Sequence, residues 1–401
     1  GSIKTSGFTA ANGEGYFCNT SGGAFTATLP ASPSAGDIVS FSDYTRTFQT
    51  NPLTVGRNSE PIGGVAADAL LGTDGQTATF VYVDGTEGWI NIQETSNSVI
   101  GNQFIVATGG TITTCGNDKI HTFTGPGTFT VCTVAACAAN NVVSHLVIAG
   151  GGGGGINQGG GGGAGGYREV KSPVTPYTAS PLDGYPSAPN RVTVTAQAYP
   201  ITVGAGGCAP GDANLRAGSG SNSIFSTITS AGGGGGGAEA PGSSGNRPGN
   251  SGGSGGGGSG QSNPGTGGSG NTPPVTPAQG TDGGDNQPSG PGYGGGGGGG
   301  ATISGSDGLT SKGGNGGNGA TSSINGTPTA RAGGGGGGSL GDPGTAPGGS
   351  GGGGNGAGTP GRAGSAGTVN TGGGGGAGSG GPTNAGYNGG SGIVIIRYKF
   401  Q

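Results

Sequence analysis

The sequence predicts an all-β protein in which a small N-terminal β-domain precedes a glycine-rich domain. In that second domain we expect polyglycine-II helices, which are similar to polyproline-II helices, to pack as a sandwich closed by a C-terminal strand. Three observations predict this fold class. Glycine contributes 111 of the 401 residues but only 14 of the first 100. Many later glycines gather in short runs, and the chain ends in the apolar, β-branched segment 392–400.

The N-terminal part, residues 1–97, is typical of a small β-sandwich or meander. Short segments alternate between apolar and polar residues, and turn pairs such as Asp74-Gly75 and Asp84-Gly85 separate them. We expect six to eight strands here. The single tryptophan, Trp89, is predicted to lie in the core.

Residues 98–149 predict a second β-unit that leads into the glycine-rich domain, residues 150–401. Its expected strands are 104–107, the pair 121–124 and 128–131, and 142–149. The turn Gly125-Pro126-Gly127 predicts that the middle pair forms a hairpin. Further strands are expected later in the chain, at 191–195, 199–203, 223–225 and 227–229.

The closing segment, residues 392–400, organises this prediction. Residues 393–396 are Ile-Val-Ile-Ile, which is typical of a strand buried on both faces. The segment is too short to span a membrane. Its best candidate partner is 142–149, so pairing would make the glycine-rich interval a closed insertion within one fold.

The glycine runs themselves allow three structures: flexible coil, tight crossings between strands, or packed polyglycine-II helices. The last type has three residues per turn and a rise of ~3.1 Å, and its amides point outward to neighbours. The similar lengths of the runs and the strands that bracket them favour packed helices. The runs are 150–155, 159–163, 232–237, 255–258, 294–300, 333–338, 351–354 and 372–376.

Composition and motifs argue against several function classes. The formal charge is −4 and charged residues make up 8%, so nothing favours nucleic acid or membrane insertion. No glycine run ends in the Gly-Lys-Ser/Thr of a phosphate-binding loop. His121 and His145 are interpreted as structural, and Asp282 and Asp285 as a solvated loop rather than a calcium or acid–base pair. We therefore expect no enzyme, no catalytic residue, no cofactor and no metal.

Five cysteines leave one without a partner. Cys115, Cys132 and Cys137 cluster in sequence and are candidates for a disulfide that staples a small β-unit outside the cell. Free buried thiols are the alternative. A metal site is not favoured, because no pair has close C-x₂-C spacing.

The candidate binding residues lie within or beside the long segment 171–190, which several prolines stiffen. Tyr177 and Tyr185 lie within it, and tyrosine rings stack on sugars and anchor protein contacts. Arg168 and Arg191 flank it and suit carboxylates or phosphates on a surface. The alternative is that the tyrosines pack within the fold and the arginines only solubilise it.

Four segments resemble the glycine-rich domain of bacteriophage tail fibres and adhesins over roughly residues 120–400. They are 146–155, 159–168, 201–207 and the ending 389–398. The resemblance implies an extracellular structural protein of the virion tail. Loops at the distal end of a polyglycine sandwich would attach it to a host-surface glycan or protein.

The same resemblance implies further partners. Fibres are commonly homotrimers, so residues 1–97 would serve stacking or trimerisation and would join other fibre or tail proteins. The alternative function is an extracellular structural filament or surface-matrix protein with no specific receptor.

Overall fold

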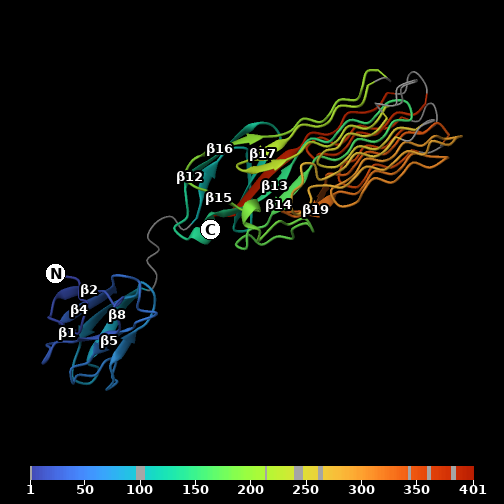
Figure 1. Cartoon of the computed structure of the whole chain (residues 1–401). Helices are drawn as coiled ribbons and strands as arrows, with labels where there is room; N and C mark the ends of the chain where they lie inside the picture. The colour runs from blue at the N-terminus through green and yellow to red at the C-terminus, as the bar shows by residue number, and fades with distance from the viewer. Residues whose placement is uncertain are drawn as a thin grey trace. The chain divides into compact units, whose positions relative to one another are not determined.

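The computed structural model describes residues 2–95, 104–212, 215–238, 247–260, 265–341, 345–358, 363–380 and 385–401. The chain divides into two compact units, Gly1–Ile100 (unit 1) and Gly101–Gln401 (unit 2) (Figure 1). The architecture is all-β apart from two single-turn 3₁₀ helices in the described residues, η1 (Ala138–Asn141) and η2 (Ala188–Asn190).

Unit 1 contains two four-stranded sheets, which confirms the prediction of six to eight strands. One has the order β1 (Phe8–Thr9), β3 (Phe25–Thr28), β5 (Leu53–Gly56), β6 (Ala69–Leu71). The other has the order β2 (Glu14–Cys18), β4 (Ile38–Asp43), β7 (Thr77–Tyr82), β8 (Trp89–Thr95). Alternate residues of these strands form one core, in which Trp89 is fully buried as predicted.

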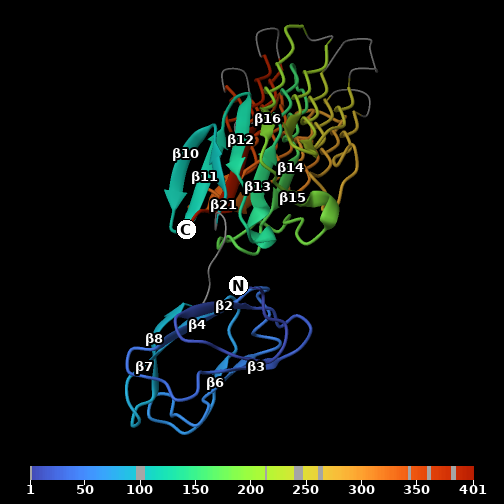
Figure 2. The same ribbon diagram turned by 90° about the vertical axis from the view of Figure 1, so that its left-hand side faces the viewer.

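Unit 2 begins with two larger sheets. The first has the order β10 (Thr111–Cys115), β11 (Asp118–Phe123), β21 (Ile393–Lys399), β13 (Val142–Ile148), β14 (Tyr167–Val170), and β15 (Val192–Thr193) also pairs with β13 (Figure 2). The second has the order β18 (Ile228–Ser230), β17 (Ser223–Phe225), β16 (Ala198–Thr202), β12 (Gly127–Thr133), β9 (Val106–Thr108). A separate pair joins β19 (Ala320–Ser322) and β20 (Thr329–Arg331).

The predicted pairing of the closing strand is confirmed. β21 lies antiparallel between β11 and β13, and its Ile396 faces His121 on one side and His145 on the other. Both faces of the strand are buried. Val394, Ile396 and Tyr398 join one core cluster, while Ile393 and Ile395 join another.

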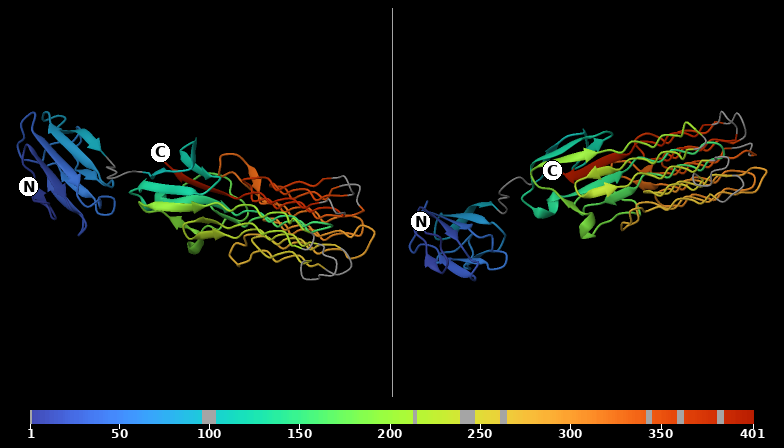
Figure 3. Two further views of the ribbon diagram at one scale, coloured as in Figure 1. Left: turned by 90° about the horizontal axis from the view of Figure 1, so that it is seen from above. Right: turned by 45° about the horizontal axis from the view of Figure 1, so that its top comes forward.

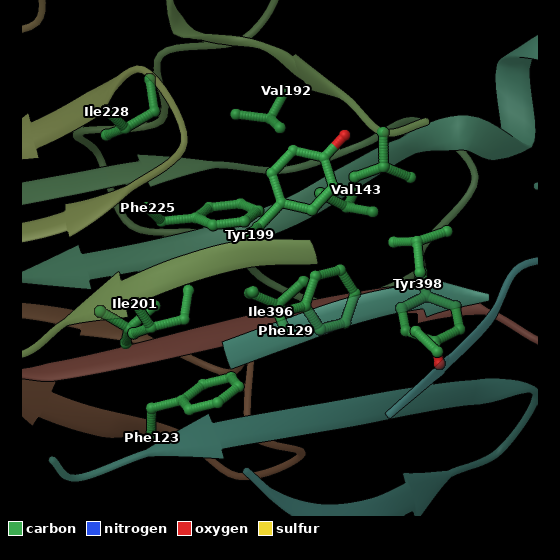
Figure 4. Packing of buried hydrophobic residues seen from close by; sticks show 14 of the residues in the cluster. Phe123, Phe129, Val143, Val192, Tyr199, Ile201, Phe225, Ile228, Ile396 and Tyr398 are labelled. Carbon is green, nitrogen blue, oxygen red and sulfur yellow. The ribbon is translucent and has the colours of Figure 1, made fainter. Parts of the chain in front are cut away.

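The predicted hairpin over 121–131 is not formed. β11 and β12 lie in different sheets, since β11 pairs with β10 and β21 while β12 pairs with β9 and β16. Phe123 and Phe129 belong to the same core cluster, together with Tyr199 and Phe225 (Figure 4). The glycine-proline turn therefore carries the chain from one sheet to the other, because this connection buries both phenylalanines between the sheets.

The glycine-rich segments lie side by side as long traces that extend from the sheets of unit 2 (Figure 3). We call the described segments between Gly150 and Ser391 that bond to one another the glycine lattice. Along the first run, every third amide donates to the same neighbouring segment. The acceptors, in order from Gly150 to Gly155, are the carbonyls of Ser221, Gly390, Gly163, Gly218, Tyr387 and Gly160.

The run 159–166 lies at the centre of the glycine lattice, because six other segments bond to it. Its amides donate to three of them: 231–237, 296–299 and 372–375. Its carbonyls accept from the other three: 149–155, 254–257 and 335–338. Packing this close excludes side chains. A Cβ added to Gly162 would lie 2.1 Å from the carbonyl oxygen of Gly152, far below the 3.0 Å that real Cβ atoms keep.

Side chains accept many amides at the boundary of the lattice. Asp282 accepts the Gly270 amide at 2.7 Å, and Asp285 accepts the Gly267 amide at 2.8 Å. Asn222 and Asn286 accept amides in the same way. The two aspartates thus complete the backbone bonding of lattice segments that are exposed to solvent.

Candidate functional site

The segment 171–190, which the sequence singles out for binding, is fixed against the sheets of unit 2. The Ser172 amide donates to Ser144 Oγ at 2.7 Å, where Ser144 lies on β13. The Lys171 amide donates to Asp183 Oδ1 at 3.0 Å, which closes the segment on itself. These contacts hold the start of the segment against β13 and tie it to Asp183.

A buried carboxylate also holds this segment. Glu169 on β14 accepts the Ser180 amide at 3.0 Å and the Tyr167 hydroxyl at 3.0 Å through Oε2. Its Oε1 accepts the Ser322 hydroxyl at 2.5 Å, which ties β14 to β19. Burial, and then the charge of Glu169, raise the pKa of Tyr167, so its hydroxyl stays a donor.

Tyr177 packs between cations. Its half-buried ring lies 5.2 Å from the guanidinium of Arg397 and 5.8 Å from Lys171 Nζ. Burial raises the pKa of the hydroxyl. Arg397 in turn forms a buried ion pair with Asp118 at 2.7 Å and donates to the carbonyl of Pro176 at 3.2 Å. Tyr177 therefore has a packing role, and ligand binding by it stays a prediction.

The other three predicted residues, Tyr185, Arg168 and Arg191, make contacts around the C-terminal part of segment 171–190. The guanidinium of Arg191 lies 5.8 Å from the Tyr185 ring. Arg168 donates to Asn190 Oδ1 at 2.7 Å, and burial lowers its pKa. Asn190 also donates to the carbonyl of Thr276 at 2.8 Å, so Asn190 connects Arg168 to the lattice segment that contains Thr276. Receptor binding by Tyr185, Arg168 and Arg191 likewise stays a prediction.

A hollow of about 600 Å³ lies between the segment and the lattice. Sequence reasoning missed it, because its lining residues are small and scattered, without a recognisable motif. They are Pro181, Leu182, Ala278, Thr281, Ala301, Thr302, Gly319, Ala320 and Thr321. Its lining side chains are mainly apolar, together with three threonines.

The turns of the glycine lattice lie at two opposite ends. The runs 150–155 and 159–166 leave β13 and return to β14, so the turn 156–158 lies at the end remote from the sheets, which we call the far end. The other end is the sheet end. The segment 171–190 adjoins the sheet end, and the far end is therefore a separate surface.

Exposed leucines occur in two far-end turns. Leu215 is 56% exposed and lies in the turn that follows the segment leaving β16. Leu309 is 49% exposed, and its carbonyl accepts the amide of Gly294 at the start of the run 294–300. Ile303 and Val369 are similarly exposed in turns at the sheet end. Both ends thus present apolar side chains to solvent.

A family model described as a glycine-rich domain matches residues 122–399. The chain belongs to this family. The match begins within β11 and ends with β21, so the glycine-rich domain includes strands of both larger sheets and the lattice between them. No curated protein matches the chain.

The cysteines of the chain all lie among its described residues, and all five are free thiols in the structure. The structure shows no bond among Cys115, Cys132 and Cys137, and a disulfide between two of them stays a prediction. Cys115 ends β10 of the first sheet and is half-buried, whereas Cys132 lies exposed on β12 of the second sheet and Cys137 is exposed beyond it. The change of sheet between β11 and β12 separates the first cysteine from the others.

Both histidines of the chain, His121 and His145, are buried, as the structural interpretation predicts. His121 contacts the carbonyl of Gly109 at 2.7 Å and the Tyr398 hydroxyl at 3.0 Å. Within the described ranges, no three His, Cys, Asp or Glu side chains gather as metal ligands. No helix in those ranges is long and apolar enough to cross a membrane.

Proposed function

We propose that the glycine runs are polyglycine-II helices packed in a sandwich, and that this sandwich is the rigid part of an attachment protein. The period of three in the backbone hydrogen bonds supports the helix type, because such a helix turns once every three residues. A β-strand would instead alternate between two sides. The six neighbours of run 159–166 suit a helix whose amides point outward in three directions.

Rigidity follows from the number of these bonds. Ordering a residue costs about 1–2 kcal/mol of backbone entropy, and glycine loses the most. A net gain of about 0.5–1.5 kcal/mol per hydrogen bond, together with Cα–H···O contacts, offsets this cost where every amide is bonded. Loss of one bond disturbs several segments at once, so the lattice is expected to be cooperative and resistant to proteases.

The asymmetry of the lattice carries the functional proposal. The sheets close one end, while the described turns of the far end, such as 156–158 and the turn at Leu309, have residues that can vary without breaking the interior. We propose that the far end attaches to a host-surface glycan or protein, as part of a phage tail fibre or adhesin outside the cell. Unit 1 would join other fibre or tail proteins in a homotrimer. The proposal includes no catalytic step.

Adsorption to cells tests the proposal. The fluorescently labelled full chain is incubated with a panel of bacteria, and the bound fraction is measured by flow cytometry. The variant Leu215→Asp/Leu309→Asp changes two far-end turns, and Ile303→Asp/Val369→Asp is the matched control at the sheet end. All four side chains are exposed, so both variants should fold.

We expect the far-end variant to lose most adsorption and the control to keep it. Equal losses in both variants, or a loss in the control alone, would contradict attachment through the far end. If the chain binds no cell in the panel and instead forms end-to-end assemblies in electron micrographs, the result contradicts attachment and favours the alternative of a structural filament.

A further inference from the structure

The outer face of the β2-β4-β7-β8 sheet in unit 1 carries an ordered polar surface. The strand register places Phe17, Ser42 and Thr77 in one row across three strands. The next row contains Gly15, Ser40 and Thr79. The residues between these positions point to the core, so both rows face away from it.

Hydroxyl pairs cross this face. Ser42 Oγ lies 2.9 Å from Thr77 Oγ1, and Ser40 Oγ lies 2.9 Å from Thr79 Oγ1. In each pair, one hydroxyl donates its proton to the oxygen of the other. Each hydroxyl pair therefore keeps a second donor and free lone pairs for a ligand.

Two aromatic rings stand beside the hydroxyls. Phe17 is 57% exposed and Tyr44 is 52% exposed, although large aromatic side chains are usually mostly buried. Their ring centroids lie 6.3 Å apart with an interplanar angle of 68°, so the rings form an open corner rather than a stack. Such a corner offers two apolar surfaces at an angle to one another.

Phe17 separates two hollows. One, of about 290 Å³, forms over Gly15, where the missing side chain leaves room beside Ser40. The other, of about 330 Å³, extends from Phe17 to Tyr44 and Arg46. Phe17, Ser42 and Thr77 line both hollows, so these form two adjoining compartments.

A planar ion pair borders the second hollow. Arg46 donates from Nε and Nη2 to the two carboxylate oxygens of Asp74, at 3.1 Å each, and both side chains remain about 40% exposed or more. The nearby Asp43 carboxylate is buried and accepts the amides of Thr47, Phe48 and Gly75. The pair is thus held in place and the surface has no excess of positive charge.

We propose that this face of unit 1 binds a short neutral glycan of two or more sugar units. One pyranose ring stacks its apolar C–H face on Phe17, and the next lies in the corner of Phe17 and Tyr44. Ser42, Thr77 and Arg46, which line the second hollow, bond to ring hydroxyls. An anionic sugar is disfavoured, because Asp74 neutralises the only cation in the lining.

This site is independent of the far end of the glycine lattice, and its test leaves the leucines of that end unchanged. Saturation-transfer NMR is measured on the full chain with maltose, cellobiose, lactose, mannobiose and the methyl glycoside of N-acetylneuraminic acid. The variants are Phe17→Ala and Tyr44→Ala. The matched control is Leu70→Ala, an equally exposed apolar side chain on the other sheet of unit 1.

We expect saturation of the ring C–H protons of at least one neutral disaccharide. Its affinity should fall by about fivefold or more in each aromatic variant and stay unchanged in Leu70→Ala. The fluorescence of Trp89 verifies that unit 1 is folded in all variants.

Three results would overturn the proposal. They are saturation of none of the neutral disaccharides, preference for the anionic glycoside, or equal affinity of Phe17→Ala and wild type. Sedimentation velocity tests the competing explanation that a second copy of the chain covers this face. If the face packs against a second copy of the chain, Phe17→Ala lowers the oligomeric state and leaves any sugar signal unaltered.

Discussion

Replacing Gly162 by alanine tests the close packing of the glycine lattice. The added Cβ would lie 2.1 Å from the Gly152 oxygen and 2.7 Å from its carbonyl carbon. The neighbouring segment must therefore move by about 1 Å to reach an ordinary contact distance. That movement stretches the bond from the Gly152 amide to the Gly163 carbonyl, now 2.8 Å, and loosens the bond from Gly162 to Gly375.

The expected cost combines two terms. Overpacking of a dense interior costs about 1–3 kcal/mol, and each lost hydrogen bond about 1 kcal/mol. With two bonds weakened, unit 2 should lose about 3–5 kcal/mol of unfolding free energy. At roughly 2 °C per kcal/mol for a large domain, its melting temperature should fall by about 6–10 °C.

Differential scanning calorimetry measures this change, with fluorescence as an internal reference. The only tryptophan of the chain, Trp89, lies in unit 1, so its thermal transition should not move. The control is Gly211→Ala in a far-end turn, where no atom lies within 4 Å of an added Cβ. That variant should melt like wild type. If Gly162→Ala melts within 1 °C of Gly211→Ala, the packing argument is wrong.

Three further predictions concern a buried ion pair, a buried histidine and the cysteines. Arg397→Met leaves the buried Asp118 carboxylate without its ion-pair partner and should cost about 3–5 kcal/mol in chemical denaturation. Burial lowers the pKa of His145 to about 3, whereas the unfolded residue has a pKa of ~6.5. Since the unfolded chain takes up a proton that the folded chain refuses, the stability of unit 2 should fall as pH drops from ~6.5 towards 3, which thermal melts at several pH values will measure. A thiol reagent should label three cysteines of the native chain quickly, while Cys18 reacts only on unfolding, because burial raises its pKa to about 12. The fast group is Cys132, Cys137 and Cys208.

Each of these predictions has a control. Arg46→Met removes an exposed ion pair and should leave the unit 1 transition in place. His145→Phe keeps a ring against Phe225 and should reduce the pH dependence, part of which remains with His121, whose pKa burial also lowers; an unchanged slope would assign it to other groups. Fewer than three fast thiols, with a mass 2 Da below the reduced chain, would reveal a disulfide.

The sequence predicts the strands of unit 2 well where burial alone decides them. The Ile-Val-Ile-Ile run needs two apolar neighbours, and β13 supplies one of them. The hairpin prediction over 121–131 failed because local turn chemistry says nothing about which sheet each strand joins. That choice depends on Phe123 and Phe129, whose common cluster forms only with distant residues such as Phe225.

The candidate site was less predictable. Composition identified 171–190 as a distinct segment, but its anchoring by Glu169 and Ser144 joins residues from different strands. Nothing in the spacing of Tyr177 indicates that it packs beside Arg397, more than 200 residues later. The aromatic face of unit 1 was not predicted from the sequence. Phe17 is exposed because of the register of β2 and β4, and the adjacent pair Tyr16-Phe17 does not indicate which of the two rings faces solvent.

The amides that Asp282 and Asp285 accept belong to exposed segments and would otherwise face solvent. A stack of bare backbones could recruit the same stack from another molecule and grow sideways without limit, as open sheet margins do in amyloid. Short polar side chains occupy these docking points. We expect such side chains to limit sideways growth of the glycine lattice in a protein with 111 glycines.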